Sequence, residues 1–512
     1  MIRPESGKTK WGLVHGSLVC LLLIGVANTQ AAAAPNIVLD RILLGPLSEE
    51  EMALEEGSET ADRHYRIGAR LLMGIEEEQS DEAALRSFES AALEGHVAAS
   101  YIAGCMRFEG RGGERNLPAA ERWFLRASIG ENANAMVNLG CVYAEGTHGQ
   151  PDLRKAARWF TQALEYEHPV ARMNMATLLL HGAGIEQDVP RAAELLKQAA
   201  EQDYVNAQAR LGIMLSEGRG IAQDFEEAIR WLRRAADRGS ASACYALAIM
   251  AMEGRGVPQD DTGAAHWFRR SAQLGSAFAM TNLGALYEEG RGVDQDYVEA
   301  ARFYTMASER GVGGGQYNLA RLYSEGLGVE RNAEEAFRWC MAAAENGLPA
   351  AQSTLAELYL EGDGVEQDLE QAILWYQRAA QAGDAEAIVT FAAIHQALGT
   401  ESQAEDAEII ALLTPLAEHG NPRAQNLLGA LWRDVAQPDL IQAAHWFEQA
   451  ALNDFVPALC NFAYQLEYGL GVDRDADRAM QLYARAQELG SDYARAKLAR
   501  IHTVNTANGI TQ

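Results

Sequence analysis

The sequence predicts an all-α fold, an α-solenoid of about twelve antiparallel helix pairs that take 36 residues each. Three observations support this prediction: a strict internal repeat, two helical patterns within each repeat, and residues at each junction that end one helix and begin the next. Helix pairs with a period of this size stack on their neighbours and bury a continuous core between them.

The repeat is marked by an apolar residue followed by glycine or alanine. The first ten copies of this dipeptide are separated by nine steps of 36 residues without an insertion, and the next three steps are 37, 34 and 36 residues long. We therefore count twelve repeats and a closing helix. The copies are Ile67-Gly68, Ala103-Gly104, Leu139-Gly140, Met175-Ala176, Leu211-Gly212, Leu247-Ala248, Leu283-Gly284, Leu319-Ala320, Leu355-Ala356, Phe391-Ala392, Leu428-Gly429, Phe462-Ala463 and Leu498-Ala499.

The first half of each repeat has the apolar stripe of an amphipathic helix, which we name helix A. In residues 277–289, Ala279, Leu283, Leu286 and Tyr287 stand at i, i+4, i+7 and i+8. This spacing places the four side chains on one face of a helix. We expect that face to contribute to the core.

The second half of each repeat predicts another helix, which we name helix B. In residues 297–310, Ala300, Phe303, Tyr304 and Ala307 have the same kind of helical spacing. Two helices joined by a short turn in each repeat predict antiparallel pairs.

The junction EEGRGVDQDYVEAA at residues 288–301 looks at first like a binding site, because Gly290 and Gly292 suggest a phosphate loop and the aspartates suggest cation ligands. A phosphate loop occurs once, between a strand and a helix, whereas this stretch recurs between two helices. Glycine just past helix A favours a left-handed cap, and Asp296 with Glu299 forms a predicted capping box for helix B. We therefore predict a turn, without nucleotide or calcium binding. The first glycine recurs as Gly110, Gly146, Gly182, Gly218, Gly254, Gly326, Gly362 and Gly469, and the N-cap residue as Asn116, Asp152, Asp188, Asp224, Asp260, Asn332, Asp368 and Asp475.

Small residues recur where neighbouring helices must touch, and tryptophans recur beside them. We expect both sets to lie in the core, with the large rings filling the gaps between layers. The small residues are Ala99, Ala135, Ala171, Ala207, Ala243, Ala279, Gly315, Ala351 and Ala387 on helix A, and Ala84, Ala120, Ala156, Ala192, Ala228, Ala264, Ala300, Ala336 and Ala372 on helix B; the tryptophans are Trp123, Trp159, Trp231, Trp267, Trp339, Trp375 and Trp446.

The N-terminal residues have the pattern of an export signal. Three basic residues precede an apolar run at residues 12–27, which is too short to cross a bilayer and leads into NTQAAAAP. We predict a signal peptide at residues 1–33 that is cleaved after Ala33, and an uncleaved anchor helix is the alternative. The exported protein is then periplasmic or secreted, without membrane insertion after the signal is removed.

The remaining chain is predicted to divide into five segments. Residues 34–63 form an acidic, partly ordered leader, and residues 64–390 hold the nine regular repeats. Residues 391–427 lose the turn glycine and form a degenerate repeat or a bend. Residues 428–503 hold the last repeats and the closing helix, and residues 504–512 form a disordered tail.

The charge and the cysteines exclude several classes of function. The chain has 43 basic and 71 acidic residues and a net charge of -28, which repels nucleic acid and anionic lipid. Five cysteines remain after the signal, an odd number without a Cys-x-x-Cys pair, so we predict neither a disulfide framework nor a zinc site. Cys105, Cys141, Cys244, Cys340 and Cys460 are expected to act as small apolar residues, one of them as a free thiol at most.

The stretch NLGALYEEGRGVDQDYVEAARFYTMASERG at residues 282–311 resembles the Sel-1-like repeat family of the tetratricopeptide-like superfamily, and the resemblance covers roughly residues 64–503. It implies a right-handed superhelix used mainly as an adaptor in protein complexes, and in bacteria an exported protein. Cysteine-rich secreted members have paired cysteines in each repeat and are linked to penicillin binding. This chain lacks that pairing.

The sequence contains no pattern that predicts catalysis. None of the histidines has the His-Glu-x-x-His spacing, there is no Gly-x-Ser-x-Gly, and no serine is followed by lysine three positions later. We therefore predict that the protein is not an enzyme and that it needs no metal or other cofactor.

A second set of apolar residues recurs on helix A, opposite its core stripe, in the first half of the array. Positions that are merely solvated should be polar, so we predict that these residues line a groove for a peptide. The alternative is that tight curvature buries them against the next turn. The groove residues are Tyr101, Cys105, Phe108, Met173, Leu180, Ile213, Tyr245, Ile249 and Met252.

A row of glutamates, which we name the acidic ladder, borders the predicted groove. It consists of Glu109, Glu145, Glu217, Glu253, Glu289, Glu325 and Glu361, and His181 interrupts it. An acidic border suits a protein or peptide partner of basic or amphipathic character. The alternative is a solvated loop preference without a binding role.

These observations predict a non-catalytic scaffold or adaptor that binds protein or peptide partners in the bacterial cell envelope. The alternative, which rests on the resemblance alone, is a protein that binds or hydrolyses cell-wall peptides or β-lactams.

Overall fold

The computed structural model describes residues 60–74, 79–147, 149–399 and 403–507. These residues form 25 α-helices and no strand, so the predicted all-α fold is confirmed. The helices are α3 (Thr60–Met73), α4 (Asp81–Leu93), α5 (Val97–Glu109), α6 (Leu117–Ile129), α7 (Ala133–Glu145), α8 (Leu153–Leu164), α9 (Pro169–His181), α10 (Val189–Glu201), α11 (Val205–Glu217), α12 (Phe225–Asp237), α13 (Ala241–Glu253), α14 (Asp261–Gln273), α15 (Ala277–Glu289), α16 (Tyr297–Ser308), α17 (Gly313–Glu325), α18 (Ala333–Glu345), α19 (Pro349–Glu361), α20 (Leu369–Gln381), α21 (Ala385–Leu398), α22 (Gln403–Glu418), α23 (Pro422–Asp434), α24 (Leu440–Ala451), α25 (Val456–Tyr468), α26 (Ala476–Glu488) and α27 (Asp492–Ala507).

The helices alternate between the A and B types along the chain. Helices α3 to α26 give twelve A–B pairs in sequence order, and α27 is the closing helix, as the repeat count predicts. The first helix begins at Thr60, a few residues before the predicted start of the repeats, and α27 ends at Ala507, within the predicted tail. The predicted signal peptide and most of the predicted leader lie outside the described residues.

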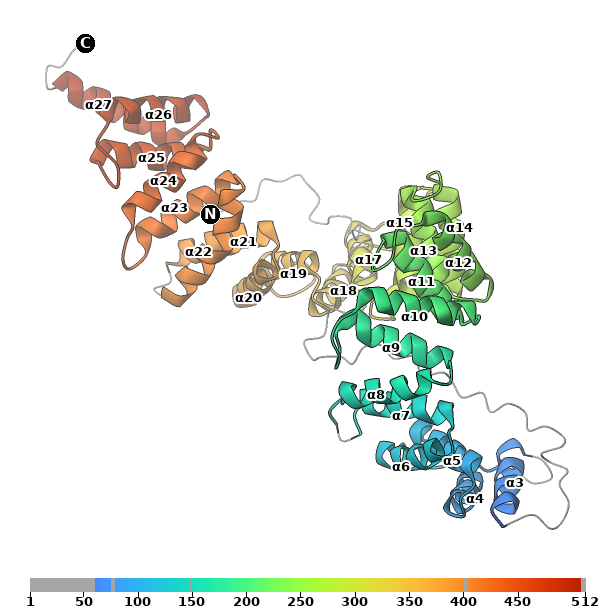
Figure 1. The fold of residues 1–512 in the computed structure, drawn as a ribbon. Coiled ribbons are helices and arrows are strands. Elements are labelled where there is room, and N and C mark those ends of the chain that lie inside the picture. The colour runs from blue at the N-terminus through green and yellow to red at the C-terminus, as the bar shows by residue number, and fades with distance from the viewer. Residues whose placement is uncertain (1–59, 75–78, 148, 400–402, 508–512) are drawn as a thin grey trace. The chain divides into compact units, whose positions relative to one another are not determined.

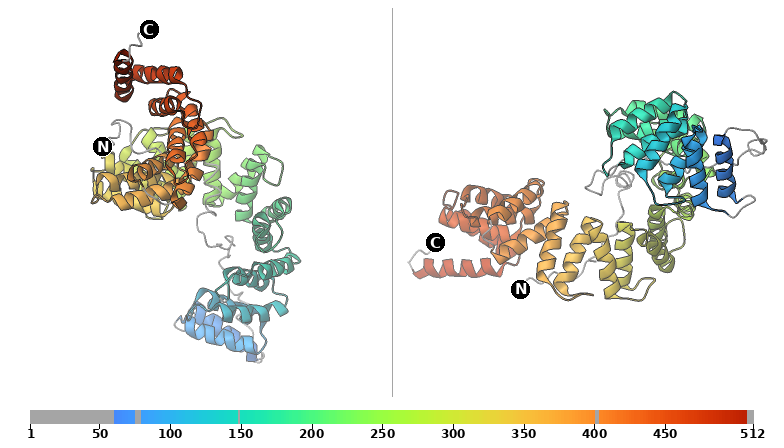
Figure 2. Two further views of the ribbon diagram at one scale, coloured as in Figure 1. Left: turned by 90° about the vertical axis from the view of Figure 1, so that its left-hand side faces the viewer. Right: turned by 90° about the horizontal axis from the view of Figure 1, so that it is seen from below.

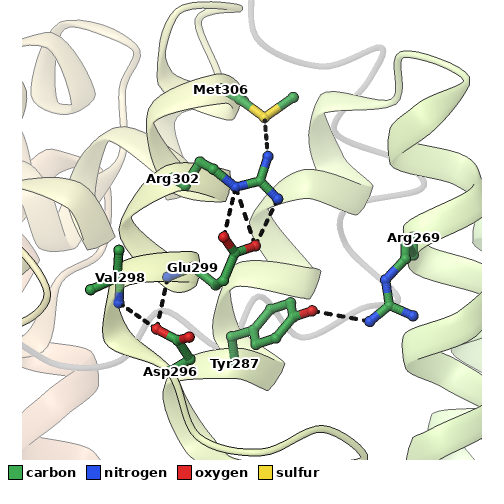
Figure 3. Close-up of polar contacts among 7 residues, drawn as sticks. All are labelled: Arg269, Tyr287, Asp296, Val298, Glu299, Arg302 and Met306. Carbon is green, nitrogen blue, oxygen red and sulfur yellow. Dashed lines mark hydrogen bonds and ion pairs between the residues drawn. The ribbon is translucent and has the colours of Figure 1, made fainter.

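The chain forms two compact units, which are described separately. The N-terminal unit contains α3 to α15, and the C-terminal unit begins at Asp296 and contains α16 to α27. Within each unit, successive helices lie side by side, and each helix B also packs on the next helix A (Figures 1 and 2). Arg269 of α14, for example, donates a hydrogen bond to the Tyr287 hydroxyl of α15 at 3.1 Å (Figure 3). Each unit is thus an α-solenoid.

The degenerate repeat forms a helix pair of a different kind. Helix α22 packs mainly on the following helix α23 and only weakly on its own partner α21, unlike the other pairs. It also contains Pro415, which removes one backbone donor inside the helix. The expectation that this repeat loses its turn glycine was wrong, because Gly399 ends α21 in a left-handed conformation, with φ 65° and ψ 45°. Helix α21 has 14 residues, one more than α19, so the glycine is displaced by one position.

The glycine of the repeat dipeptide lets helix A approach helix B closely. A Cβ atom on Gly140 would lie 2.3 Å from the Phe160 ring, and one on Gly104 would lie 2.6 Å from the Phe124 ring. Both rings are fully buried. An added methyl group would therefore force the two helices apart, which close-packed cores tolerate poorly.

The tryptophans correct one expectation. Of the seven recurring tryptophans, only Trp375 is buried, and the other six are half-buried. The residue that follows the tryptophan, such as Phe124, Phe160 or Phe268, fills the core in their place. A tryptophan places its indole at the edge of the stack, where Trp123 donates to the Glu89 carboxylate at 3.2 Å.

Four of the five described cysteines are buried, and Cys460 is half-buried. None of them is in a disulfide. Burial raises the pKa of the Cys105, Cys244 and Cys460 thiols, which keeps them protonated. They behave as small apolar residues, as predicted.

Candidate partner-binding surface

The Gly-x-Gly junction is a helix-to-helix turn, as predicted. Gly290 has φ 69° and ψ 33°, a left-handed conformation, and its N–H donates to the Leu286 carbonyl of α15. Asp296 accepts hydrogen bonds from the backbone N–H groups of Val298 and Glu299 at 2.9 and 3.0 Å (Figure 3). Both residues therefore cap helices, Gly290 at the end of α15 and Asp296 at the start of α16.

The predicted capping box is only half formed. The carboxylate of Glu299 accepts hydrogen bonds from Arg302, one turn further along α16, at 2.7 to 3.2 Å (Figure 3). It points along the helix and not back to the amide of Asp296. Glu299 therefore stabilises the surface of α16 through an i,i+3 ion pair.

The second glycine of the junction has a role that the sequence analysis missed. Gly292 has φ 67°, and a Cβ atom there would lie 2.1 Å from the backbone carbonyl oxygen of Asp261, at the start of helix B in the preceding repeat. Arg291 stabilises this close approach between the junction and the start of α14, because its guanidinium donates hydrogen bonds to both carboxylate oxygens of Asp261, at 2.9 and 3.2 Å. The junction therefore also joins neighbouring repeats.

The residue before the N-cap closes the turn from the other side. The Gln295 side chain donates to the Glu288 carbonyl in the last turn of α15 at 2.8 Å, and Gln187 donates to the Leu180 carbonyl of α9 at 2.7 Å. Backbone carbonyls in the last turn of a helix have no hydrogen-bond donor within that helix. The side-chain amides of Gln295 and Gln187 supply the missing donors. The recurrence of Gln or Arg just before the N-cap was the signal for this contact.

The structure contradicts the exposure expected for most of the predicted groove. Six of the nine groove residues are buried, and three are half-buried. Burial also raises the pKa of the Tyr245 hydroxyl to about 12. The expectation of an open apolar face was therefore wrong for these six positions. The buried residues are Cys105, Phe108, Met173, Leu180, Tyr245 and Ile249, and the half-buried residues are Tyr101, Ile213 and Met252.

The next helix A covers these positions. The Asn282 amide of α15 donates to the Tyr245 hydroxyl of α13 at 3.2 Å, and Asn174 of α9 donates to the Cys141 sulfur of α7 at 3.6 Å. Arg210 of α11 likewise reaches the Thr177 hydroxyl at 2.7 Å. Successive A helices are thus in side-chain contact, and the apolar residues between them form a seam of the solenoid.

The acidic ladder remains at the surface. Each of its glutamates is the last residue of a helix A, in α5, α7, α11, α13 and α15 of the N-terminal unit and in α17 and α19 of the C-terminal unit. All are exposed except Glu289, which is half-buried, and the intervening His181 is exposed. The ladder therefore follows one edge of each stack, beside the seam.

Nearby arginines neutralise part of the ladder. Arg115 lies 2.6 Å from the Glu145 carboxylate, and Arg321 lies 3.2 Å from the Glu325 carboxylate. In the Glu-Gly-Arg-Gly turns, Arg255 and Arg291 lie 3.6 and 3.4 Å from the glutamates two positions before them. Apart from the buried Arg321, these side chains are partly exposed, so the pairs reduce the negative potential of the edge without abolishing it.

Helix electrostatics adds to the negative potential. The C-terminal end of a helix carries a partial negative charge, and it favours a cation, so a glutamate in the last position is unfavourable. The A helices of a stack point in one direction, and their C-terminal ends lie along the same edge. Helix stability therefore does not account for the ladder, and the edge is suited to attract a cationic group.

The described part of the chain contains no group of three or more side chains placed to bind a metal ion. Within the same residues, every helix is too short or too polar to cross a membrane.

The chain is similar to known helical repeat proteins. A crystal structure of a protective antigen present in uropathogenic Escherichia coli strains, which displays an SLR fold, is 30% identical and covers 81% of this chain and 90% of its own, with a TM-score of 0.50. A Sel1 repeat protein from Oxalobacter formigenes is 27% identical over 49% of this chain and all of its own, with a TM-score of 0.45. The DAP3-binding cell death enhancer 1 of Rattus norvegicus is 29% identical over 112 residues, so the chain matches about a fifth of that protein's length.

The Sel1 repeat matches most of the chain in eleven segments, and the pair α21–α22 falls in the gap between the ninth and the tenth. The gap, residues 385–421, overlaps the predicted degenerate repeat at residues 391–427. The segments are residues 64–96, 97–130, 133–165, 169–204, 205–240, 241–276, 277–312, 314–348, 349–384, 422–455 and 456–491. The chain belongs to the Sel1 repeat family.

Proposed function

We propose that the protein is a non-catalytic scaffold of the bacterial cell envelope, which binds protein or peptide partners through basic residues placed along the acidic ladder. Sel1 repeat proteins bind protein partners in general. The single observation that carries the finer proposal is the row of carboxylates at helix C-termini, all exposed except Glu289, where the helix dipole disfavours them. The envelope location rests on the export pattern of residues 1–33.

The spacing of the ladder sets the kind of partner that fits. Packed helices lie about 10 Å apart, so successive ladder carboxylates recur at about that distance. An extended chain rises about 3.3 Å per residue and a helix 1.5 Å, so basic residues every third position of an extended peptide, or every seventh position of a helix, match the ladder. The half-buried Tyr101, Ile213 and Met252 offer apolar contacts beside the ladder.

A charge-neutral variant tests this proposal. Changing Glu109, Glu145, Glu217 and Glu253 to glutamine removes four charges from the edge of the N-terminal unit. Exposed ion pairs contribute about 0.5 kcal/mol each, so the partner's binding should weaken by about 2 kcal/mol, or about thirtyfold in Kd. Binding should also weaken as salt rises beyond about 0.15 M, where charges are screened over about 8 Å.

The matched control changes four exposed glutamates of the B layer, Glu165, Glu194, Glu201 and Glu226, to glutamine. The net charge changes equally in both variants, so a general electrostatic effect would weaken both. Partners are captured from envelope extract with the unmodified protein, identified by mass spectrometry, and titrated against all three proteins. Equal affinity for the ladder variant and the unmodified protein would exclude the ladder as the binding edge.

A further inference from the structure

The first helix of the array leaves part of its apolar face uncovered. Ile67 of α3 is 37% exposed, although the equivalent residues Ala103 and Leu139 of the next two repeats are fully buried. Met73, at the end of α3, is 40% exposed. In later repeats the preceding helix B packs on helix A, as α4 packs on α5, and α3 has no such neighbour among the described helices.

A solenoid normally closes such an end with an atypical terminal segment, because an apolar end face promotes association. The sequence just before α3 contains one segment of suitable composition. NIVLDRILLGPL at residues 36–47 has Val38, Leu39, Ile42 and Leu43 at i, i+1, i+4 and i+5, a spacing that places them on one side of a helix. The polar Asp40 and Arg41 lie between them in the sequence.

The connecting chain is long enough for this segment to reach any point of α3. Twelve residues separate Leu47 from Thr60, and the thirteen steps between these two residues can span about 43 Å when the chain is extended. Helix α3 has 14 residues and is therefore about 21 Å long. Reach does not limit the contact.

The charges of the connection and of α3 are opposite in sign. Residues 48–59 read SEEEMALEEGSE, which includes six glutamates and no basic residue. Helix α3 carries Arg63, Arg66 and Arg70 against one acidic residue, Asp62. Opposite charges favour an approach of the connection to α3, and hence of the apolar segment to Ile67.

We propose that residues 36–47 dock on the uncovered face of α3, where they take the place of the missing preceding helix B and close the N-terminal end of the solenoid. The segment buries Ile67 as a preceding helix buries the equivalent residues of later repeats. The proposal concerns a contact within one chain and is independent of the acidic ladder.

Disulfide trapping in the exported chain tests the proposal. The variant with Leu43→Cys and Ile67→Cys is oxidised under mild conditions and digested, and the linked peptides are identified by mass spectrometry. A disulfide needs Cα atoms within about 7 Å, so a bond between positions 43 and 67 in a monomer is the expected result. The control pairs Leu43→Cys with Ile129→Cys on α6, which is 84% exposed, and should remain unlinked.

Three other outcomes would overturn the proposal. A 43–67 link found only in a covalent dimer would show that the segment docks on a second copy. A link no more frequent than that of the control would show that the segment does not rest on α3. The third outcome concerns the variant Leu39→Asp/Leu43→Asp, in which docking predicts at least tenfold faster amide exchange in α3. Unchanged amide exchange in α3 of this variant would show that the segment does not cover Ile67. Met52→Asp/Leu54→Asp in the acidic connection is the matched control and should leave exchange unchanged.

Discussion

Alanine at Gly292 tests the contact between neighbouring repeats that the structure assigns to the second glycine of each junction. The substitution has two separable effects. Alanine is strained at φ 67°, and its Cβ atom would lie 2.1 Å from the carbonyl oxygen of Asp261. Since no real Cβ atom approaches a backbone oxygen so closely, the junction and the start of α14 must separate.

The structure provides controls that isolate the two effects. Gly275 has φ 94° and nothing within 4 Å of an added Cβ atom, so Gly275→Ala tests strain alone, at about 1 to 3 kcal/mol. Gly290→Ala adds a 3.1 Å contact with the Cβ atom of Gln295, which a shift of a few tenths of an ångström relieves, so it should cost only slightly more. Overpacking against a backbone costs a further 1 to 3 kcal/mol, so Gly292→Ala should cost about 2 to 6 kcal/mol in total.

The assay must resolve individual repeats, because a repeat array does not unfold as a single two-state unit. Hydrogen exchange read by mass spectrometry gives the opening free energy of each helix. For Gly292→Ala the loss should be largest in α14, whose first residue Asp261 is displaced, and in α15, which ends at the disturbed junction. If Gly292→Ala and Gly275→Ala destabilise equally, the inter-repeat role of the second glycine is refuted.

Three further predictions concern the core, pH and thiols. Phe160→Ala should cost about 3 to 5 kcal/mol in a denaturant titration, because the ring is fully buried against Gly140; a loss below 1 kcal/mol would contradict that packing. Burial lowers the pKa of His96 below 6.5, and its Nδ1 accepts the Ala99 N–H of α5 at 3.1 Å, so the unfolded chain binds the extra proton more readily. The stability that neutral His96 contributes is therefore present above pH 6.5 and is lost as pH falls below 6.5. His96→Asn keeps an N-cap side chain that does not titrate, so it should remove this part of the pH dependence of the melting temperature. Under native conditions a thiol reagent should label the half-buried Cys460 before the four buried cysteines, and a faster reaction at any of those would contradict their burial.

The repeat, the pairing and the caps could be predicted from the sequence because each depends on local chemistry. Asp296 caps α16 and Gly290 ends α15 for reasons contained within a few neighbouring residues. The second glycine could not be explained in that way. Its partner, the backbone of Asp261, lies about thirty residues away and is brought close only by stacking.

The prediction of an exposed apolar groove was wrong for a related reason. An apolar position on helix A can face solvent, a partner or the next helix A, and hydrophobic spacing alone does not distinguish these cases. The sequence did contain a signal, a recurring asparagine just before the apolar residue of the repeat dipeptide, as at Asn138, Asn174 and Asn282. A polar residue that recurs within an apolar helix needs a buried partner, and Tyr245 and Cys141 provide it.

Carbodiimide crosslinking tests the central claim, that the acidic ladder is the binding edge, most directly. This reagent joins a carboxylate to an amine only when the two groups are in contact, so crosslinked peptides from the captured complex identify the glutamates that touch a lysine of the partner. The account predicts links at Glu109, Glu145, Glu217 and Glu253, which are lost at 0.5 M salt. Links concentrated on the B-layer glutamates Glu165, Glu194, Glu201 and Glu226, with the ladder unmodified, would contradict it.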